Sequence, residues 1–302
     1  MRAASTFFYR RPYWYLALLL VPPLLWFGTV YLGSLFALLW QSFYRIDDFT
    51  AQIVREPTLE TYKQLVTQPA NVDIVLRTVS MAIAVTIACA AIALPIANYM
   101  VRYASPRTRA LFYVGVMLPM WMSYLVKVYA WRLILAKQGI LSWLLDTVGL
   151  GAALDAVLRI PGIGGPSLSS SYLGMFIVFV YMWLPFMILP LAAALEKVPE
   201  SLLQASADLG ARPAQTFRTV TLPLALPGLA AGSVFTFSLT LGDYIAPSLV
   251  GGPGSSLIGT VVFENLGLAN NLPFAAAFAT IPLAIMAVYL ALMKRLGAFE
   301  SL

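Results

Sequence analysis

Long stretches without any charged residue constrain this chain more than any other feature of its sequence. Most of them exceed the ~20 residues that an α-helix needs to cross the hydrocarbon core of a bilayer. They run from Pro12 to Tyr44, Thr78 to Val101, Ala110 to Val126, Ile160 to Leu195, Thr219 to Gly242 and Asn265 to Met293. With 60% hydrophobic and 11% charged residues, the chain is too apolar for a water-soluble globule, in which about a quarter of the residues are charged. The sequence therefore predicts an integral membrane protein.

The same runs predict an all-α architecture. A transmembrane β-strand alternates apolar and polar residues over ~10 positions, and the runs show no such alternation. Six transmembrane helices are expected, near residues 13–40, 74–101, 109–131, 172–195, 222–245 and 274–293. The first is longer than the core of a signal peptide and no cleavage site follows it, so it is expected to be retained. No internal repeat is visible, and residues 1–302 are expected to form a single transmembrane domain.

An even number of spans places both termini on the same side of the membrane. That side would hold eleven of the 19 Lys and Arg residues, and the bias is sharpest in the short loop from Arg102 to Arg109. Because short loops rich in Lys and Arg stay in the cytoplasm, both termini are expected to be cytoplasmic. Four tryptophans near span ends have the positions of interfacial anchors: Trp14, Trp40, Trp131 and Trp183.

Two connections on the opposite side are too long for simple hairpins, from Phe43 to Asp73 and from Arg132 to Ser171. Within the second, residues 140–158 carry an apolar stripe at helical spacing. The stripe consists of Leu141, Leu144, Leu145 and Val148. It predicts a short helix lying on the membrane surface.

Composition excludes several kinds of chemistry. The chain has no histidine and a single cysteine, Cys89, which lies within an apolar run and is interpreted as a packing residue. A Cys/His metal cluster, a Ser-His-Asp set and a disulfide are excluded, and no catalytic residue or metal ligand is predicted. No lysine follows a glycine, so any ATP would have to be bound by a partner. The basic residues flank the apolar runs, which argues against nucleic-acid binding despite a net charge of +6.

The connection between the fourth and fifth spans contains a predicted helix. Pro199 suits the first turn, Glu200 favours the positive end of the helix dipole, and Gly210 provides a stop, so a helix is expected from Pro199 to Leu209. Its mainly apolar face consists of Leu202, Leu203, Ser206 and Leu209. Such a face needs either the bilayer surface or a protein partner to cover it.

This connection resembles a known motif. It reads Gln204-Ala205-Ser206, then three residues, Gly210, nine residues, and Val220-Thr221-Leu222-Pro223. The spacing is similar at every element to the cytoplasmic signature of type I ABC importer permeases, which is Glu-Ala-Ala, three residues, Gly, nine residues and Ile-x-Leu-Pro. Gln replaces Glu, Ser replaces the second Ala and Val replaces Ile, which puts in doubt any salt bridge of the family's glutamate. The resemblance covers roughly residues 77–295 and implies the six-helix, MetI-like permease fold and a location in a bacterial cytoplasmic (inner) membrane.

The resemblance also implies a role and partners. Residues 199–210 would be a coupling helix that docks into a cleft of an ATPase subunit. Its candidate docking residues are Pro199, Glu200, Leu203, Gln204, Ala205, Ser206, Asp208, Leu209 and Gly210. The partners would be a second permease subunit, expected to be a different chain, two ATP-binding subunits that hold ATP and magnesium, and an extracytoplasmic substrate-binding protein. The alternative is a self-sufficient channel or secondary transporter, which would need no exposed coupling helix.

Four further stretches are similar to spermidine/putrescine importer permeases and their amine or opine relatives. They are Leu184 to Pro190, Ala194 to Lys197, Leu241 to Tyr244 and Leu249 to Gly252. This resemblance implies a polyamine-like substrate. Because Leu- and Pro-rich span ends recur across importers, another small organic ion remains the alternative.

Asp243 is a candidate for the substrate pathway on physical grounds. A carboxylate at the end of a span is costly in lipid unless it faces protein, water or a cation. Tyr244 beside it and Glu264 at the start of the next apolar run could complete an acidic, aromatic lining that attracts an ammonium group. Two structural alternatives remain open: Asp243 caps a broken helix or pairs with Lys127 or Arg132, and Glu264 lies in water.

Overall fold

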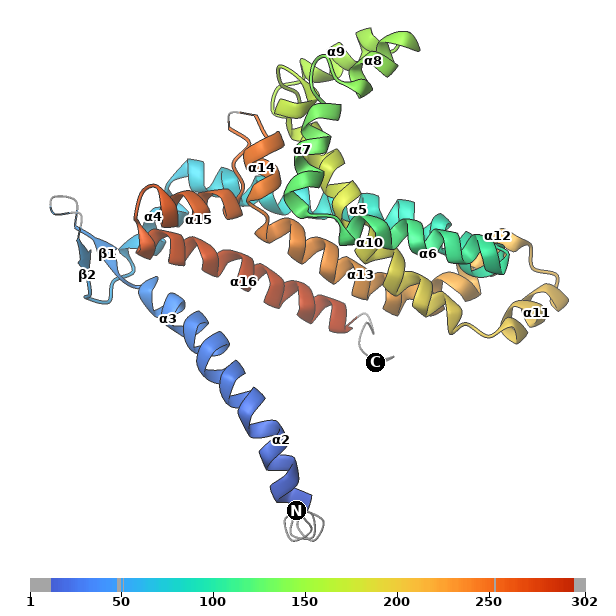
Figure 1. Cartoon of the computed structure of the whole chain (residues 1–302), viewed down its shortest axis with the longest axis horizontal. Coiled ribbons are helices and arrows are strands. Elements are labelled where there is room, and N and C mark those ends of the chain that lie inside the picture. Colours follow the sequence, from blue (N-terminus) through green and yellow to red (C-terminus); the bar gives the residue numbers. More distant parts are fainter. Residues whose placement is uncertain (1–11, 48–49, 51, 253, 296–302) are drawn as a thin grey trace.

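The computed structural model describes residues 12–47, 50, 52–252 and 254–295, and it is a bundle of long helices (Figure 1). Within this part of the chain, five helical segments are long and apolar enough to cross a membrane, and a bent pair of helices makes a sixth. The first unbent span is Leu16–Gln41, formed by α2 (Pro12–Trp26), the π-helical η1 (Phe27–Leu32) and α3 (Gly33–Gln41). The fifth, Pro213–Gly242, is formed by α12 (Pro213–Thr216), the π-helical η3 (Phe217–Thr221) and α13 (Leu222–Gly242). The other unbent spans are α5 (Pro69–Arg102), α10 (Tyr172–Glu196) and α16 (Leu272–Arg295). The six-span helical prediction is thus confirmed, with longer second and fifth helices.

The third span is not the straight helix expected at residues 109–131. It consists of α6 (Pro106–Trp121) and α7 (Tyr124–Ile134), which meet at an angle of 98°. Met122 takes an extended conformation at the break. Lys127, only 8% exposed, donates a hydrogen bond of 2.9 Å from its ammonium to the carbonyl of Pro119 in the last turn of α6. A buried cation at the C-terminal end of a helix satisfies a carbonyl that the break leaves without its helical partner.

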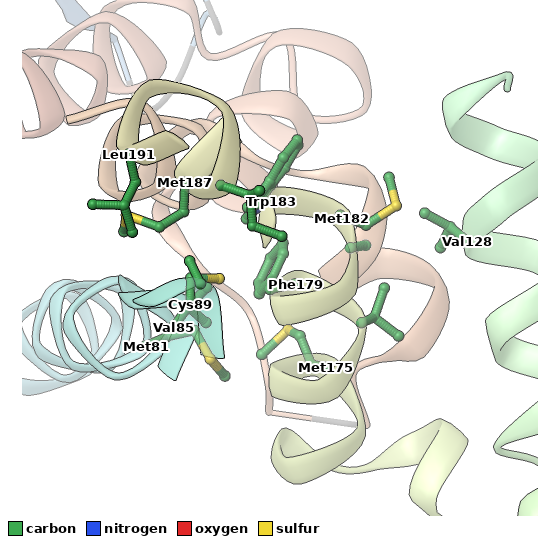
Figure 2. Packing of buried hydrophobic residues seen from close by; sticks show 14 of the residues in the cluster. Met81, Val85, Cys89, Val128, Met175, Phe179, Met182, Trp183, Met187 and Leu191 are labelled. Atoms are coloured by element: carbon green, nitrogen blue, oxygen red, sulfur yellow. The ribbon is translucent and has the colours of Figure 1, made fainter. Parts of the chain in front are cut away.

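The core of the bundle lies between α5, α10 and α13. Figure 2 shows side chains of α10, including Met175, Phe179 and Met187, facing Cys89 and its neighbours on α5. Cys89 is fully buried there, which confirms its interpretation as a packing residue. By contrast, none of the first span's most apolar stretch is buried in this chain, and α2 extends away from the other helices (Figure 1).

Small residues let α10 and α13 approach closely. A Cβ atom added to Gly228 would lie 2.4 Å from the Cβ of Ala194 and 2.6 Å from the carbonyl oxygen of Pro190. One added to Gly232 would lie 2.8 Å from the sulfur of Met187. Glycines four residues apart form the close-packing surface that is common between membrane helices, where van der Waals contact replaces the hydrophobic effect.

The remaining elements connect the spans. One end of the bundle carries α11 (Glu200–Asp208). The opposite end carries the hairpin of β1 (Arg45–Ile46) and β2 (Ile53–Val54), α4 (Glu60–Thr67), α14 (Ile245–Val250) and α15 (Ile258–Gly267). The expected single helix at residues 140–158 is instead two helices, α8 (Ile140–Thr147) and α9 (Gly151–Leu158). Gly149 separates them with a φ of +80°, a conformation that ends a helix. Together with α7 they form an arm that projects from the bundle (Figure 1).

The close contact between α10 and α13 yields a stability prediction. Gly228→Ala is expected to lower the free energy of unfolding by about 1–3 kcal/mol, because the new methyl group meets backbone and cannot be accommodated without displacing a helix. Gly115→Ala in α6 is the matched control, since no atom lies within 4 Å of its added Cβ. Thermal denaturation of the purified protein in detergent measures both. Equal midpoints for the two variants would contradict the close contact.

Candidate functional site

The helix between the fourth and fifth spans is present as expected. It is α11 (Glu200–Asp208), which begins one residue after Pro199. At its end, the amide of Gly210 donates to the carbonyl of Ala207 at 2.8 Å and the amide of Ala211 donates to that of Ser206 at 3.1 Å. With Gly210 at a φ of +80°, these two bonds form a Schellman motif, which satisfies the last carbonyls of the helix.

The apolar face expected on α11 is divided between two directions. Leu202 and Leu209 point outward, with exposures of 44% and 88%. Leu203 and Ser206 are half-buried and turn toward the rest of the chain. The expectation of one common face is therefore wrong for these four positions, because α12 and η3 cover one side of the helix. Leu209 is almost fully exposed among the described residues, whereas Leu202 borders a cavity of about 360 Å³ that Ala194 and Leu224 also line.

Ser206, which stands where the importer signature has alanine, joins α11 to the next element. Its hydroxyl lies 2.9 Å from the hydroxyl of Thr216 in α12. The other candidate docking residues Glu200, Gln204, Ala205 and Asp208 are exposed. Gln204 lines a cleft of about 390 Å³ between α11, α12 and the end of α5, together with Asn98, Arg102, Glu200 and Leu203 among others. The replacement of glutamate by Gln204 leaves no ion pair at this position among the described residues.

Sequence reasoning missed a set of contacts directly before α11. Arg102, in the last turn of α5, donates two hydrogen bonds of 3.0 Å, to the carbonyls of Leu195 and Val198. The Glu196 carboxylate pairs with the Arg109 guanidinium at 3.1 Å and accepts a hydrogen bond of 2.9 Å from the Tyr113 hydroxyl. From the sequence, the basic loop from Arg102 to Arg109 indicates only the orientation of the spans in the membrane. Its contacts could not be predicted, because no local sequence pattern connects it to residues more than 80 positions away.

Asp243 lies at the other end of the bundle, immediately after α13. One carboxylate oxygen accepts hydrogen bonds from the amides of Ile245 and Ala246, at 2.8 and 3.0 Å. The other accepts a hydrogen bond from the hydroxyl of Tyr124 in α7. Asp243 therefore caps a broken helix, which is one of the two structural roles considered for this residue; the other is an ion pair with Lys127 or Arg132. Within the described residues it forms no ion pair with Lys127 or Arg132, so that alternative is wrong.

Asp243 is 9% exposed and lines a cavity of about 310 Å³. Its lining residues are Tyr124, Trp183, Ser238, Leu239, Gly242, Asp243, Tyr244 and Ile245. Trp183 was expected as an interfacial anchor, but it is only 6% exposed and stacks against Tyr124 at 6.0 Å. Its buried indole N–H has no hydrogen-bond partner among the described residues. The cavity thus combines a carboxylate, aromatic rings and an indole N–H that has no hydrogen-bond partner among the described residues.

Contrary to the expectation from the sequence, Tyr244 and Glu264 do not line a common cavity. Tyr244 lines the cavity and its ring stacks on Phe263 of α15 at 4.5 Å. Glu264, the next residue of α15, is exposed and does not line the cavity. Tyr124, Trp183 and Ser238 complete the lining instead. Sequence reasoning could not find them, because α7, α10 and α13 converge only in the folded chain.

The arrangement defines a class of protein: a membrane-spanning subunit with a capped helix presented between its fourth and fifth spans. The chain belongs to the family of binding-protein-dependent transport system inner membrane components, whose model matches residues 89–298. It is a type I ABC importer permease subunit, and a multi-pass protein of the inner membrane.

Relatives of known name support this assignment. The chain is 59% identical over 298 residues to the inner membrane ABC transporter permease protein YdcU of Escherichia coli (strain K12), covering 99% of this chain and 95% of the relative. It is 34% identical over 220 residues to the spermidine/putrescine transport system permease protein PotB of Haemophilus influenzae, covering 73% of this chain and 72% of the relative.

Two solved structures share the fold. A chain of a bacterial ABC transporter that imports the acidic polysaccharide alginate matches with a TM-score of 0.73 at 16% identity, over 97% of this chain and 99% of that chain. A chain of the MetNI methionine ABC transporter in an inward-facing conformation matches with a TM-score of 0.54 at 18% identity, over 74% and 93%. At these identities the likeness concerns the fold alone, and it confirms the MetI-like architecture.

The end of α11 yields a second prediction. Gly210→Val is expected to destabilise the helix end by about 1–2 kcal/mol, because a β-branched residue is strained at positive φ. Space is not the cause, since no atom lies within 4 Å of an added Cβ. Gly210→Asn is the control, because asparagine tolerates this conformation. Amide hydrogen exchange over residues 206–212 is expected to accelerate in the valine variant only, and equal rates in both variants would contradict the cap.

Proposed function

We propose that this chain forms half of the substrate pathway of an ATP-driven importer and that α11 is its coupling helix. The observation that carries the proposal is α11 itself, a capped helix that presents Leu202 and Leu209 outward. Exposed apolar patches rimmed by polar residues mark protein interaction sites, and here Glu200, Gln204 and Asp208 are exposed on the same short helix. A channel that works alone has no use for such a helix, which is why this alternative is not favoured.

The partners follow from this role. An ATPase subunit would receive α11 and hold ATP and magnesium, and two such subunits would serve two permeases. The second permease would cover the apolar first span, which this chain leaves unburied. A binding protein would deliver the substrate at the end that carries α14 and α15. Closure of the ATPase subunits would then move the membrane helices as rigid bodies and switch access to the pathway.

We infer that the substrate is a polyamine or a related small organic amine. Two features support this class: the name of the PotB relative and the chemistry of the Asp243 cavity. An ammonium group is attracted both by a carboxylate and by the faces of aromatic rings. Tyr124, Trp183 and Tyr244 supply such rings around Asp243. Glu264 has no part in this cavity.

The substrate proposal is tested with Asp243→Asn. The amide oxygen of asparagine still accepts the hydrogen bonds of Ile245 and Ala246, so the complex is expected to assemble and hydrolyse ATP. Uptake of radiolabelled spermidine or putrescine is expected to fall about tenfold, because a hydrogen-bonded charge contributes about 1.5–3 kcal/mol. Asp155→Asn, an exposed acid on α9, is the control. Unchanged uptake by Asp243→Asn, or transport of an anion, would refute the cationic pathway.

The orientation is tested with single cysteines. With cytoplasmic termini, Ser105→Cys at the start of α6 is expected to react with a membrane-impermeant maleimide only in inverted vesicles. Ser255→Cys, in the segment between α14 and α15, is expected to react only in intact spheroplasts. Cys89 does not interfere because it is fully buried. The reverse labelling pattern would overturn the orientation and, with it, the role of α11.

A further inference from the structure

The contacts of α11 determine which membrane helices a displacement of α11 can reach. The helix has no buried residue, and it packs on α12 and η3, the elements that follow it. These lead into the fifth span, so a displacement of α11 reaches α13 directly, through the Ser206–Thr216 hydrogen bond among others. No comparable packing joins α11 to α6 or to α5, whose end faces it across the cleft of about 390 Å³. A second connection is needed if these helices move together with α11.

Arg102 supplies this connection. Its guanidinium holds the carbonyls of Leu195 and Val198, and Val198 directly precedes Pro199, the residue that begins α11. Both acceptor residues are buried, at 1% and 5% exposure. A cation at the carbonyl end of a helix is favoured by the helix dipole, and a planar guanidinium can engage two acceptors at once. The end of α5 is thereby fixed to the start of α11.

Glu196, the last residue of α10, connects α6 to the same group of helices through its contacts with Arg109 and Tyr113. The Arg109 guanidinium also donates to the carbonyl of Val101 in α5, at 3.4 Å. The Arg109–Glu196 pair is 35% and 41% exposed, and ion pairs at this exposure contribute little. Arg102, which bonds to buried carbonyls, is therefore the residue that determines the connection.

We propose that Arg102, Arg109, Tyr113 and Glu196 form an arginine clamp that makes α5, α6 and α10 move as one body with the start of α11, and that Arg102 is its positioning residue. The proposal rests on the proposed role of α11 as a coupling helix. It assigns two routes to a displacement of α11: one through Arg102 to α5, α6 and α10, and one through α12 to α13. Loss of the first route leaves ATP hydrolysis intact but separates it from transport.

The first test is a distance that does not depend on transport. Spin labels are placed on Arg107→Cys in α6 and on Ser201→Cys in the first turn of α11, both at exposed positions outside the candidate docking residues. The distance distribution is measured in the assembled complex with and without ATP. A narrow distribution that is the same in both states is expected with Arg102 in place. Arg102→Ala is expected to broaden it. An unchanged distribution in Arg102→Ala overturns the clamp.

The second test is the coupling ratio, measured as substrate taken up per ATP hydrolysed in proteoliposomes. In Arg102→Ala it is expected to fall at least about tenfold, because two charge-assisted hydrogen bonds are lost, while ATP hydrolysis continues. Arg107→Ala is the control, because Arg107 lies nearby, in the first turn of α6, and makes no hydrogen bond or ion pair among the described residues. If Arg102→Ala does not assemble, Arg102→Lys, which keeps the charge but not the planar fork, is measured instead.

The outcomes distinguish the two proposals. A broadened distribution together with a normal coupling ratio overturns the positioning role of Arg102 and leaves the coupling helix intact. A wild-type complex that takes up no substrate on ATP hydrolysis contradicts the proposed function itself, whatever the distances. A broadened distribution, a reduced coupling ratio and a normal Arg107→Ala control support the clamp.

Discussion

The close contact between α10 and α13 is the interaction on which the rest of the structure depends. Gly228 and Gly232 let α13 approach the backbone of α10, and a single methyl group at Gly228 would meet Ala194 and Pro190. Between helices in lipid, such van der Waals contact is the main attractive force, because the surrounding acyl chains are as apolar as the side chains. The pair then provides the surface on which α5 packs to complete the core (Figure 2).

This pair also joins the two candidate sites. One end of α10 leads through Glu196 and Val198 into α11, and its middle supplies Trp183 to the cavity. One end of α13 is reached from α11 through α12, and its other end is Asp243. A displacement of α11 therefore acts on α10 and α13, two of the helices that line the cavity. Well-packed helices resist deformation, so it is transmitted as a movement of whole helices.

Sequence reasoning succeeded where the determining forces are local. Apolar runs located the spans, because a helix that contacts lipid must be apolar along its own length. Pro199 and Gly210 located α11 to within one residue, because the backbone conformation at a helix end is determined by the residue that stands there. It failed where tertiary contacts decide. The bend between α6 and α7 depends on Lys127 reaching back to Pro119, and the cavity depends on Tyr124 meeting Asp243 across 119 positions. Glu264 was chosen from its charge and place in the sequence, but its position on α15 leaves it outside the cavity.

The central claim is that α11 docks on an ATPase subunit, and proximity labelling tests it most directly. A photoreactive group attached to Ala205→Cys, exposed on α11, is activated in membranes from cells that carry out uptake, and the products are identified by mass spectrometry. The same group on Ala153→Cys, exposed on α9, serves as the control. The account predicts a cross-link from α11, and none from α9, to a subunit that carries a phosphate-binding loop. Cross-links from α11 to lipid alone, in membranes that still take up substrate, would contradict it.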